Sequence, residues 1–377
     1  MTETRAEFRL PTQELRDDLP FYTGVLGMAL DMIYPADDPQ VAVLSGHGLR
    51  LRIEKGAPEG PGTIRILTSD PDGFANGERV LTAPNGTRVE IDQIDPPLIL
   101  PRAEHAFVVR RLADQAPWVV GRAGMQYRDL VPTRLGGAMI ASHIRIPGGG
   151  PVPDMVHFHK VGFQLIFCVA GWVDVLYEDQ GGMRRIAAGD CFIQPPEIRH
   201  RVCEAGDGVE VIEIGVPAEH ITEIDHEMIL PTPEYRPDRE WQGQKFVHSI
   251  GAEGVFRPFR IPGFEARDTT INENTGGVAS VMVARPAGAP APWTVHEGDI
   301  LFTFVMRGGM TLHGEGKEPN RLARGDAFVI PPGLATRYAD PSDDLELLEV
   351  SLPGVFETRV VDARIGPSAR RPVGDSG

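Results

Sequence analysis

Short apolar runs, rich in valine, isoleucine and phenylalanine, alternate with polar turns along most of this chain. Its 43 glycines and 34 prolines separate these runs, which have the length of strands rather than of amphipathic helices. The first part of the chain differs, because leucine and aromatic residues recur at helical spacing between Leu15 and Gly27. The pattern therefore predicts a mainly β protein with one short helix near its N-terminus.

The β pattern occurs twice in the sequence. Residues 189–196, Gly-Asp-Cys-Phe-Ile-Gln-Pro-Pro, return as residues 325–332, Gly-Asp-Ala-Phe-Val-Ile-Pro-Pro, and residues 209–214 return at the same offset as residues 345–350. A constant offset over both strands and turns is typical of a duplicated domain. The sequence thus predicts two copies of one β domain.

The repeat defines the domain organisation that we expect. A connector rich in proline and aromatic residues separates the two copies, and the last residues are typical of a solvated tail. The expected parts are an N-terminal module at residues 1–95, a linker at 96–125, the first β domain at 126–225, a connector at 226–265, the second β domain at 266–365 and the tail at 366–377.

Composition and charge exclude several classes of function. The chain has 53 acidic and 37 basic residues, a formal charge of −16, and such a surface repels phosphate backbones and anionic lipid. The first residues lack the apolar core of a secretory signal, and no apolar run is long enough to span a membrane. We therefore expect a cytoplasmic protein that binds a small molecule, with no nucleic-acid or membrane partner.

Three histidines in the first β domain are candidate metal ligands. His157 and His159 are two residues apart, which on a strand places both imidazoles on the same face. His200 lies in the block that begins at Gly189. A metal centre is the leading interpretation, and the alternative is a relic domain whose histidines only hydrogen-bond one another.

These two blocks resemble the signature motifs of the cupin superfamily. In that family a His-x-His pair, a carboxylate and a later histidine converge inside a small barrel, and the spacing from Gln164 to Gly171 and from Gly189 to His200 agrees with the pattern. The resemblance implies a bicupin, with two cupin barrels of the jelly-roll (double-stranded β-helix) type. It also implies that the metal ligands are His157, His159, Gln164 and His200.

The sequence departs from the cupin pattern at Gln164. The family most often has glutamate there, so a neutral amide replaces an anionic ligand. Ligation by the amide is expected to be weak or absent, and the ion would keep its full charge. Glu197 replaces a glycine that is common in the second block, which affects the turn before His200.

The second β domain lacks most of the ligands. Alignment of the two copies places Thr294, His296, Leu301 and Thr336 at the four ligand positions. One imidazole cannot hold a metal. We therefore expect this barrel to be structural or to offer a partner surface.

Two polar residues precede the histidine pair. His143 and Arg145 share one face of a strand, and Ile144 and Ile146 share the other. If the polar face looks into the barrel, Arg145 could hold a substrate carboxylate and His143 could act as an acid or base. The alternative is that this face is solvated.

The N-terminal module has its own pattern. Strands are expected at residues 41–44, 49–53 and 87–91, which with the helix and a first strand gives a βαβββ order. Residues 18–27, Asp-Leu-Pro-Phe-Tyr-Thr-Gly-Val-Leu-Gly, and residues 83–90, Ala-Pro-Asn-Gly-Thr-Arg-Val-Glu, resemble one module of the vicinal-oxygen-chelate (glyoxalase-like) family.

That second resemblance implies metal ligands on the first and last strands of the module, at Glu7 and Glu90. Such sites form between two facing modules, and the sequence shows one. We therefore expect a structural or dimerising module rather than a second metal site. An unpaired module exposes a strand edge, so we also expect a symmetric homodimer.

A centre of three neutral histidines leaves positions open for a substrate and O₂ on Fe(II). The cupin resemblance thus implies a dioxygenase that acts on a small aromatic acid, an enol or diketone, or a thiol. Zinc, manganese and nickel are alternative metals, because imidazole binds all of them. Two alternative functions stay open at this point, a metal-dependent lyase, isomerase or hydrolase, and a non-catalytic cupin that binds a small ligand.

Overall fold

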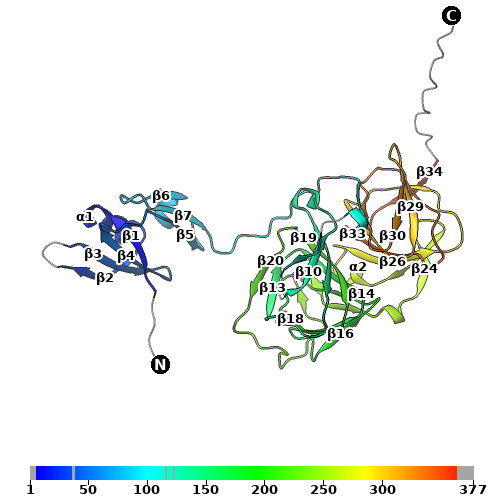
Figure 1. Cartoon of the computed structure of the whole chain (residues 1–377), viewed down its shortest axis with the longest axis horizontal. Helices are drawn as coiled ribbons and strands as arrows, with labels where there is room; N and C mark the ends of the chain where they lie inside the picture. Colours follow the sequence, from blue (N-terminus) through cyan, green and yellow to red (C-terminus); the bar gives the residue numbers. More distant parts are fainter. Residues whose placement is uncertain (1–5, 36–38, 115–116, 122–123, 363–377) are drawn as a thin grey trace, which may run out of the picture. The chain divides into compact units, whose positions relative to one another are not determined.

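A computed structural model describes residues 6–35, 39–114, 117–121 and 124–362 of the chain (Figure 1). The expected tail at 366–377 lies outside the described residues. The chain divides into two compact units, Met1–Pro97 and Leu98–Gly377. Within the described ranges, no helix has the length and apolar character that crossing a membrane requires.

The first unit begins with a four-stranded sheet in the order β1-β4-β3-β2, in which β1 runs parallel to β4. Its strands are β1 (Phe8–Thr12), β2 (Ala29–Tyr34), β3 (Val41–Gly46) and β4 (Leu49–Lys55). The helical segment α1 (Leu15–Pro20) continues into η1 (Phe21–Val25), and its buried Leu15 and Tyr22 pack on this sheet. This sheet and helix have the expected βαβββ order.

A second sheet of the unit has the order β5-β7-β6, with β5 parallel to β7. Its elements are β5 (Thr63–Thr68), η2 (Phe74–Gly77), β6 (Val80–Thr82) and β7 (Arg88–Gln93). The strand that we expected at 87–91 belongs here, so its assignment to the βαβββ sheet was wrong. Strand β2 takes its place, and it was missed because its sequence, Ala-Leu-Asp-Met-Ile-Tyr, lacks the regular apolar–polar alternation that marks a half-buried strand.

The second unit contains two β-barrels, each made of two facing sheets (Figure 1). The seven-stranded sheet of the first barrel has the order β23-β17-β14-β19-β11-β10-β9, with β9 (Val119–Val120), β10 (Gln126–Asp129), β11 (Ile140–Ile146), β14 (Phe163–Ala170), β17 (Cys191–Ile193), β19 (Val209–Val216) and β23 (Val247–Ser249). The facing sheet has the order β16-β15-β18-β13-β20, with β12 beside β18, and comprises β12 (Gly150–Pro151), β13 (His157–Lys160), β15 (Trp172–Tyr177), β16 (Arg184–Ala187), β18 (His200–Ala205) and β20 (Ile221–Ile224).

The second barrel repeats this plan. Its seven-stranded sheet has the order β24-β25-β26-β33-β28-β31-β8, with β8 (Val108–Arg110), β24 (Phe256–Pro258), β25 (Phe264–Asp268), β26 (Ser280–Pro286), β28 (Ile300–Arg307), β31 (Ala327–Val329) and β33 (Glu346–Leu352). Its facing sheet has the order β30-β29-β32-β27-β34, with β27 (Trp293–His296), β29 (Gly309–Gly314), β30 (Asn320–Ala323), β32 (Thr336–Ala339) and β34 (Thr358–Val361). The expected mainly β fold with two jelly-roll barrels is confirmed.

Short elements complete the second unit. They are η3 (Leu112–Asp114), η5 (Arg134–Gly137), the hairpin of β21 (Glu240–Trp241) and β22 (Gln244–Lys245), η6 (Gly251–Glu253) and α2 (Ile271–Asn274). The expected linker and connector also supply strands to the barrels. From the linker, β8 pairs with β31 of the second barrel and β9 with β10 of the first, and from the connector, β23 pairs with β17 and β24 with β25.

Three apolar cores hold this unit together, one inside each barrel and one between them. Successive side chains of β14 point to opposite faces of the sheet, so this strand contributes to two of the cores. Phe163 and Phe167 lie in the core between the barrels, with Phe302 of the second barrel, and Cys168 lies in the core inside the first barrel. The two seven-stranded sheets thus pack face to face.

Candidate metal centre

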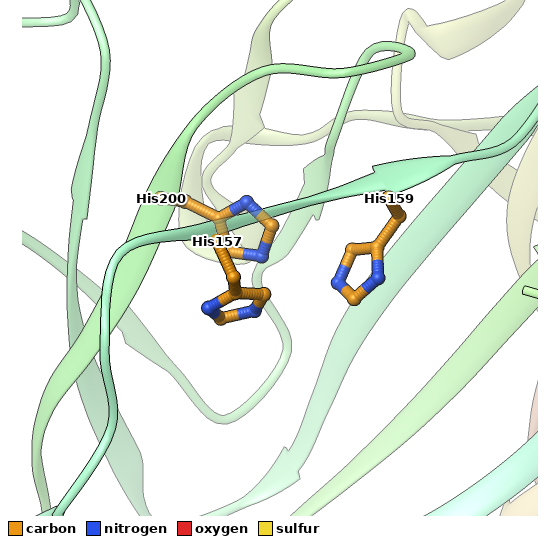
Figure 2. A group of neighbouring side chains, drawn as sticks. All are labelled: His157, His159 and His200. Carbon is orange, nitrogen blue, oxygen red and sulfur yellow. The ribbon is translucent and has the colours of Figure 1, made fainter. Parts of the chain in front are cut away.

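The three candidate histidines converge inside the first barrel (Figure 2). His157 and His159 project from β13, and His200 starts the neighbouring strand β18 directly opposite His157. All three are buried, and their ring centroids lie 4.2 to 5.1 Å apart. Each ring offers a nitrogen, and these nitrogens all lie within 4.8 Å of one another.

Hydrogen bonds on the far side of the rings orient two of the nitrogens. The Nδ1 of His157 lies 2.7 Å from the carbonyl oxygen of Met155, and the Nδ1 of His200 lies 3.0 Å from that of Ile198. A carbonyl oxygen only accepts, so each Nδ1 carries the proton and each Nε2 keeps its lone pair. The Nδ1 of His159 is 2.9 Å from the hydroxyl of Thr222 on β20. This donor set fits a divalent metal that takes imidazole ligands.

Gln164 lies on the inward face of β14 and is 1% exposed. Its Nε2 donates to the Oε1 of Glu213 over 2.8 Å. The amide oxygen is therefore the atom that Gln164 could offer to a metal, and its ligation stays a prediction.

Glu213 and His220 also belong to this region, and neither was predicted from the sequence. With His159 they form a second group whose ligand atoms lie within 4.8 Å of one another. The ring of His220 stacks on that of His159 at 4.4 Å, and its Nε2 is 3.9 Å from the Oε1 of Glu213. We expected only neutral groups around the ion, and the structure places a carboxylate beside Gln164.

A signal for Glu213 was present in the repeat. Glu213 interrupts otherwise apolar inward positions on β19, and its counterpart Glu349 lies on the inward face of the buried strand β33. A carboxylate in such a position has a partner or a function. The signal for His220 is weaker, because it follows β19 in a turn.

The strand β11 presents its apolar face to the interior. Ile144 and Ile146 line the cavity beside the histidines, whereas His143 and Arg145 lie on the opposite face. Arg145 stacks over the ring of Trp118 at 4.3 Å. The condition for their catalytic roles, a polar face that looks into the barrel, is therefore not met.

His143 instead belongs to a polar network between the barrels. Its ring lies 5.3 Å from that of Phe304 in the second barrel, its Nε2 donates to Glu210 over 3.0 Å, and its Nδ1 accepts from Arg128. Burial lowers the pKa of His143, and the hydrogen bond from His143 lowers the pKa of Glu210. A neutral imidazole matches this arrangement, because one ring nitrogen accepts and the other donates.

A cavity of about 70 Å³ adjoins the histidines. Its walls are mostly apolar, and the described residues that line it include no lysine or arginine. The lining residues are Met125, Tyr127, Ile144, Ile146, His159, Ile166, Val173, Val175, Tyr177, Phe192, Gln194, His200, Val202, Val209, Val211 and Glu213. Burial raises the pKa of Tyr177 above its usual range, and the amide of Gln194 donates to its oxygen over 2.8 Å.

The equivalent interior of the second barrel holds an ion pair. Arg260, from the connector, donates to both carboxylate oxygens of Glu349, and the Nε–Oε1 distance is 2.9 Å. The Nε2 of His296 donates to the carbonyl of Ile330 over 3.1 Å. Burial, and then the charge of Arg260, lowers the pKa of His296 to about 4.

Glu7 and Glu90 of the N-terminal module lie apart in the secondary structure, Glu7 beside β1 and Glu90 on β7 of the other sheet. Glu7 accepts from the Nε of Arg50 over 2.8 Å, and Glu90 accepts from that of Arg88 over 3.0 Å. Each carboxylate thus has an arginine partner of its own.

Comparisons with known proteins agree with this architecture. Residues 281–351 match the family described as Cupin domain. None of the curated proteins matches the chain. Several solved structures share the fold at low identity.

An oxalate decarboxylase from Lactobacillus farciminis, in a formate complex, is 13% identical, with a TM-score of 0.52 over 71% of this chain and 92% of that one. A salicylate 1,2-dioxygenase from Pseudoaminobacter salicylatoxidans, with gentisate, is 18% identical, with a TM-score of 0.51 over 70% of this chain and 87% of that one. A mutant oxalate decarboxylase from Bacillus subtilis is 13% identical, with a TM-score of 0.51 over 69% and 82% of the two chains. The two-barrel part of this chain therefore has the cupin-type β-barrel fold of these structures, and residues 281–351 match the cupin domain.

Proposed function

We propose that the chain is a metal-dependent cupin enzyme whose centre is formed by His157, His159 and His200. The observation that carries this proposal is the convergence of three buried imidazole nitrogens within 4.8 Å of one another, beside a cavity. Two of these imidazoles are fixed in one tautomer by backbone carbonyls, as is usual for histidine ligands of metals.

The reaction that we propose is oxygen-dependent, on a small substrate. Fe(II) would supply a centre that activates O₂ beside a substrate oxygen or sulfur, and manganese, zinc and nickel are alternatives. The protein would supply the shape and dryness of the site, since isoleucine, valine and phenylalanine form most of the cavity wall. Tyr177 would orient the substrate, because a phenol that keeps its proton can donate to a substrate oxygen.

The charges of the cavity favour one part of the expected substrate range. An aromatic acid would bring a carboxylate into a lining that contains Glu213 and, among the described residues, no lysine or arginine. Burial of an anion without a cation beyond the metal is costly. We therefore favour an enol, a diketone or a thiol over an aromatic acid.

Glu213 also favours a second candidate function, a metal-dependent lyase or isomerase. Such reactions move a proton, and a carboxylate in the cavity wall is a suitable acceptor. The two candidates differ in whether turnover needs O₂.

Metal analysis and oxygen uptake test the proposal. Protein purified without chelator should carry about one equivalent of metal per chain, and His157→Ala should remove it while His296→Ala, in the second barrel, should not. Oxygen uptake is then measured with diketones, thiols, catechols and gentisate-like acids. Turnover that continues under nitrogen would select the lyase or isomerase, and wild-type protein without metal would refute the proposal.

For the N-terminal module we propose a degenerate vicinal-oxygen-chelate-like fold with a role in dimerisation. The order β1-β4-β3-β2 supports this, as does the second sheet, where β5 and β7 repeat the parallel pairing of β1 and β4. Strand β2 is an edge strand with exposed apolar residues, which is the kind of edge that pairs with a second copy. Light scattering at micromolar concentration should give the mass of a dimer, and a monomer would contradict this role.

A further inference from the structure

Glu213 lies beside the position at which a cupin most often has its carboxylate ligand. Gln164 on β14 is in register with Gly215 on β19, so Glu213, two residues away on the same face, is its diagonal neighbour. The Gln164 amide nitrogen is 2.8 Å from the Glu213 carboxylate. We propose that Glu213 is an anionic ligand of the metal centre and replaces the carboxylate that Gln164 lacks. This inference rests on the metal site proposed above.

The two barrels show why this carboxylate needs a cation. Glu349, the counterpart of Glu213 in the repeat, is buried and is neutralised by Arg260. Glu213 also faces the inside of its barrel, but no lysine or arginine among the described residues forms an ion pair with it. Its contacts are the Gln164 amide and, at 3.9 Å, the Nε2 of His220. The Glu213 side chain is 14% exposed, so it is less buried than Glu349, but a carboxylate inside a barrel still favours a compensating charge. In this proposal a metal takes the place that Arg260 has in the second barrel.

His159 links this carboxylate to the three histidines. It belongs both to the group with His157 and His200 and to the group with Glu213 and His220. His220 fits against it because position 215 is a glycine, where a Cβ would lie 3.2 Å from the His220 ring. His159 is thus the residue common to both groups, and in this proposal Glu213 approaches the ion of the three histidines from the His159 side.

Gln164 acquires a defined role in this arrangement. Its amide nitrogen donates to the Oε1 of Glu213, which leaves Oε2 to coordinate the ion. Glutamate at position 164 would instead place two carboxylates in contact, and like charges at that distance repel. Gln164 is thus a positioning residue. The negative charge of the ligand set, which a typical cupin has on the strand equivalent to β14, lies on β19 in this chain.

A charge-transposition cycle tests the proposal, with binding of Mn²⁺ to metal-free protein as the readout. The affinity is measured by competition with a chelator for the wild type, Glu213→Gln, Gln164→Glu and the double variant Gln164→Glu/Glu213→Gln. We expect Glu213→Gln to bind Mn²⁺ roughly 100-fold more weakly, the upper end of the effects seen when a partner of a metal ligand is lost. The double variant, which restores one carboxylate, should return to within about tenfold of the wild type.

Glu210→Gln is the matched control, because it removes the same charge from the opposite face of the same strand. Its affinity for Mn²⁺ should stay within about twofold of the wild type. An affinity of Glu213→Gln equal to that of the wild type, or a double variant as weak as Glu213→Gln, would overturn the inference. Failure of the wild type itself to bind Mn²⁺ would instead refute the proposed function.

A crystal structure of the Mn²⁺-loaded wild type gives a second test that depends on no variant. A carboxylate oxygen of Glu213 should lie about 2.0–2.2 Å from the ion, in the range of carboxylate–metal bonds. A Glu213 oxygen more than about 3.5 Å from the ion, or two ions that divide the histidines between them, would overturn the inference.

Discussion

Acid should destabilise the second barrel through a single histidine, His296. The side chain is 2% exposed, and its Nε2 donates to the carbonyl of Ile330. Burial and the nearby Arg260 lower its pKa from 6.5 to about 4. The folded protein therefore keeps this imidazole neutral at pH values where the unfolded chain has already bound a proton.

The sign and size of the effect follow from this difference in pKa. Above pH 6.5 both states are neutral and His296 contributes nothing to the pH dependence. Below pH 6.5 the unfolded state binds more protons, so the free energy of unfolding falls with pH until the folded state also protonates, at about pH 4. Each pKa unit is worth about 1.4 kcal/mol, which gives a loss of about 2 kcal/mol at pH 5 and about 3 kcal/mol at pH 4. This is a large share of the 5–15 kcal/mol that stabilises a typical domain.

Urea unfolding of the wild type and of His296→Gln, at pH 7 and pH 5, measures this loss. Glutamine can still donate to Ile330 but does not titrate, so the variant should lose about 2 kcal/mol less than the wild type between the two pH values. His226→Gln, which changes an exposed histidine, is the control and should follow the wild type. Parallel losses in the wild type and His296→Gln would refute the reasoning.

Three further substitutions test the first barrel. Gly171→Ala should lower the free energy of unfolding, measured in urea, by about 2 kcal/mol or more. Residue 171 has φ +71°, and a Cβ there would lie 2.9 Å from the Cα of Val209. Gly189→Ala, at φ +94° with nothing within 4 Å of the added Cβ, should cost less, and equal costs would show that the close approach has no effect. Ile166→Phe should fill the cavity that Ile166 lines without changing the histidines. Metal analysis should therefore still find about one equivalent, while turnover falls at least tenfold. Unchanged turnover would contradict the assignment of this cavity as the substrate site.

The shared orientation of His157 and His159 could be predicted because its geometry is local, and the approach of His200 was expected from the cupin resemblance. Two residues apart on a strand, His157 and His159 must share a face, and the repeat identified the block that carries His200. The structure brings the ligand nitrogens of these three histidines within 4.8 Å of one another. The barrels were predictable for a related reason, since apolar runs, turn residues and a constant offset are all properties of short stretches of sequence.

Orientation and register were not predictable in the same way. Alternation along β11 separates His143 and Arg145 from Ile144 and Ile146, but it does not say which face looks into the barrel. The contact between Gln164 and Glu213 depends on the register of β14 with β19, strands that lie far apart in the sequence. Charged residues on strand faces therefore needed the tertiary structure for their assignment.

The second barrel contributes to the centre in the first without supplying a ligand from its interior. Strands β14 and β19 carry Gln164 and Glu213 on one face, and their other faces lie in the core shared with the second barrel, where Phe163 and Ile214 belong to the same cluster as Phe302. Burial of such side chains is worth about 1.5–3 kcal/mol each, so the shared core fixes the register that brings Gln164 and Glu213 into contact. The ion pair of Arg260 and Glu349 fills the interior of the second barrel with a charge-neutral network that needs no metal. A barrel with one histidine at the four positions equivalent to the proposed ligands can thus still support its neighbour, because it holds the two strands on which Gln164 and Glu213 lie.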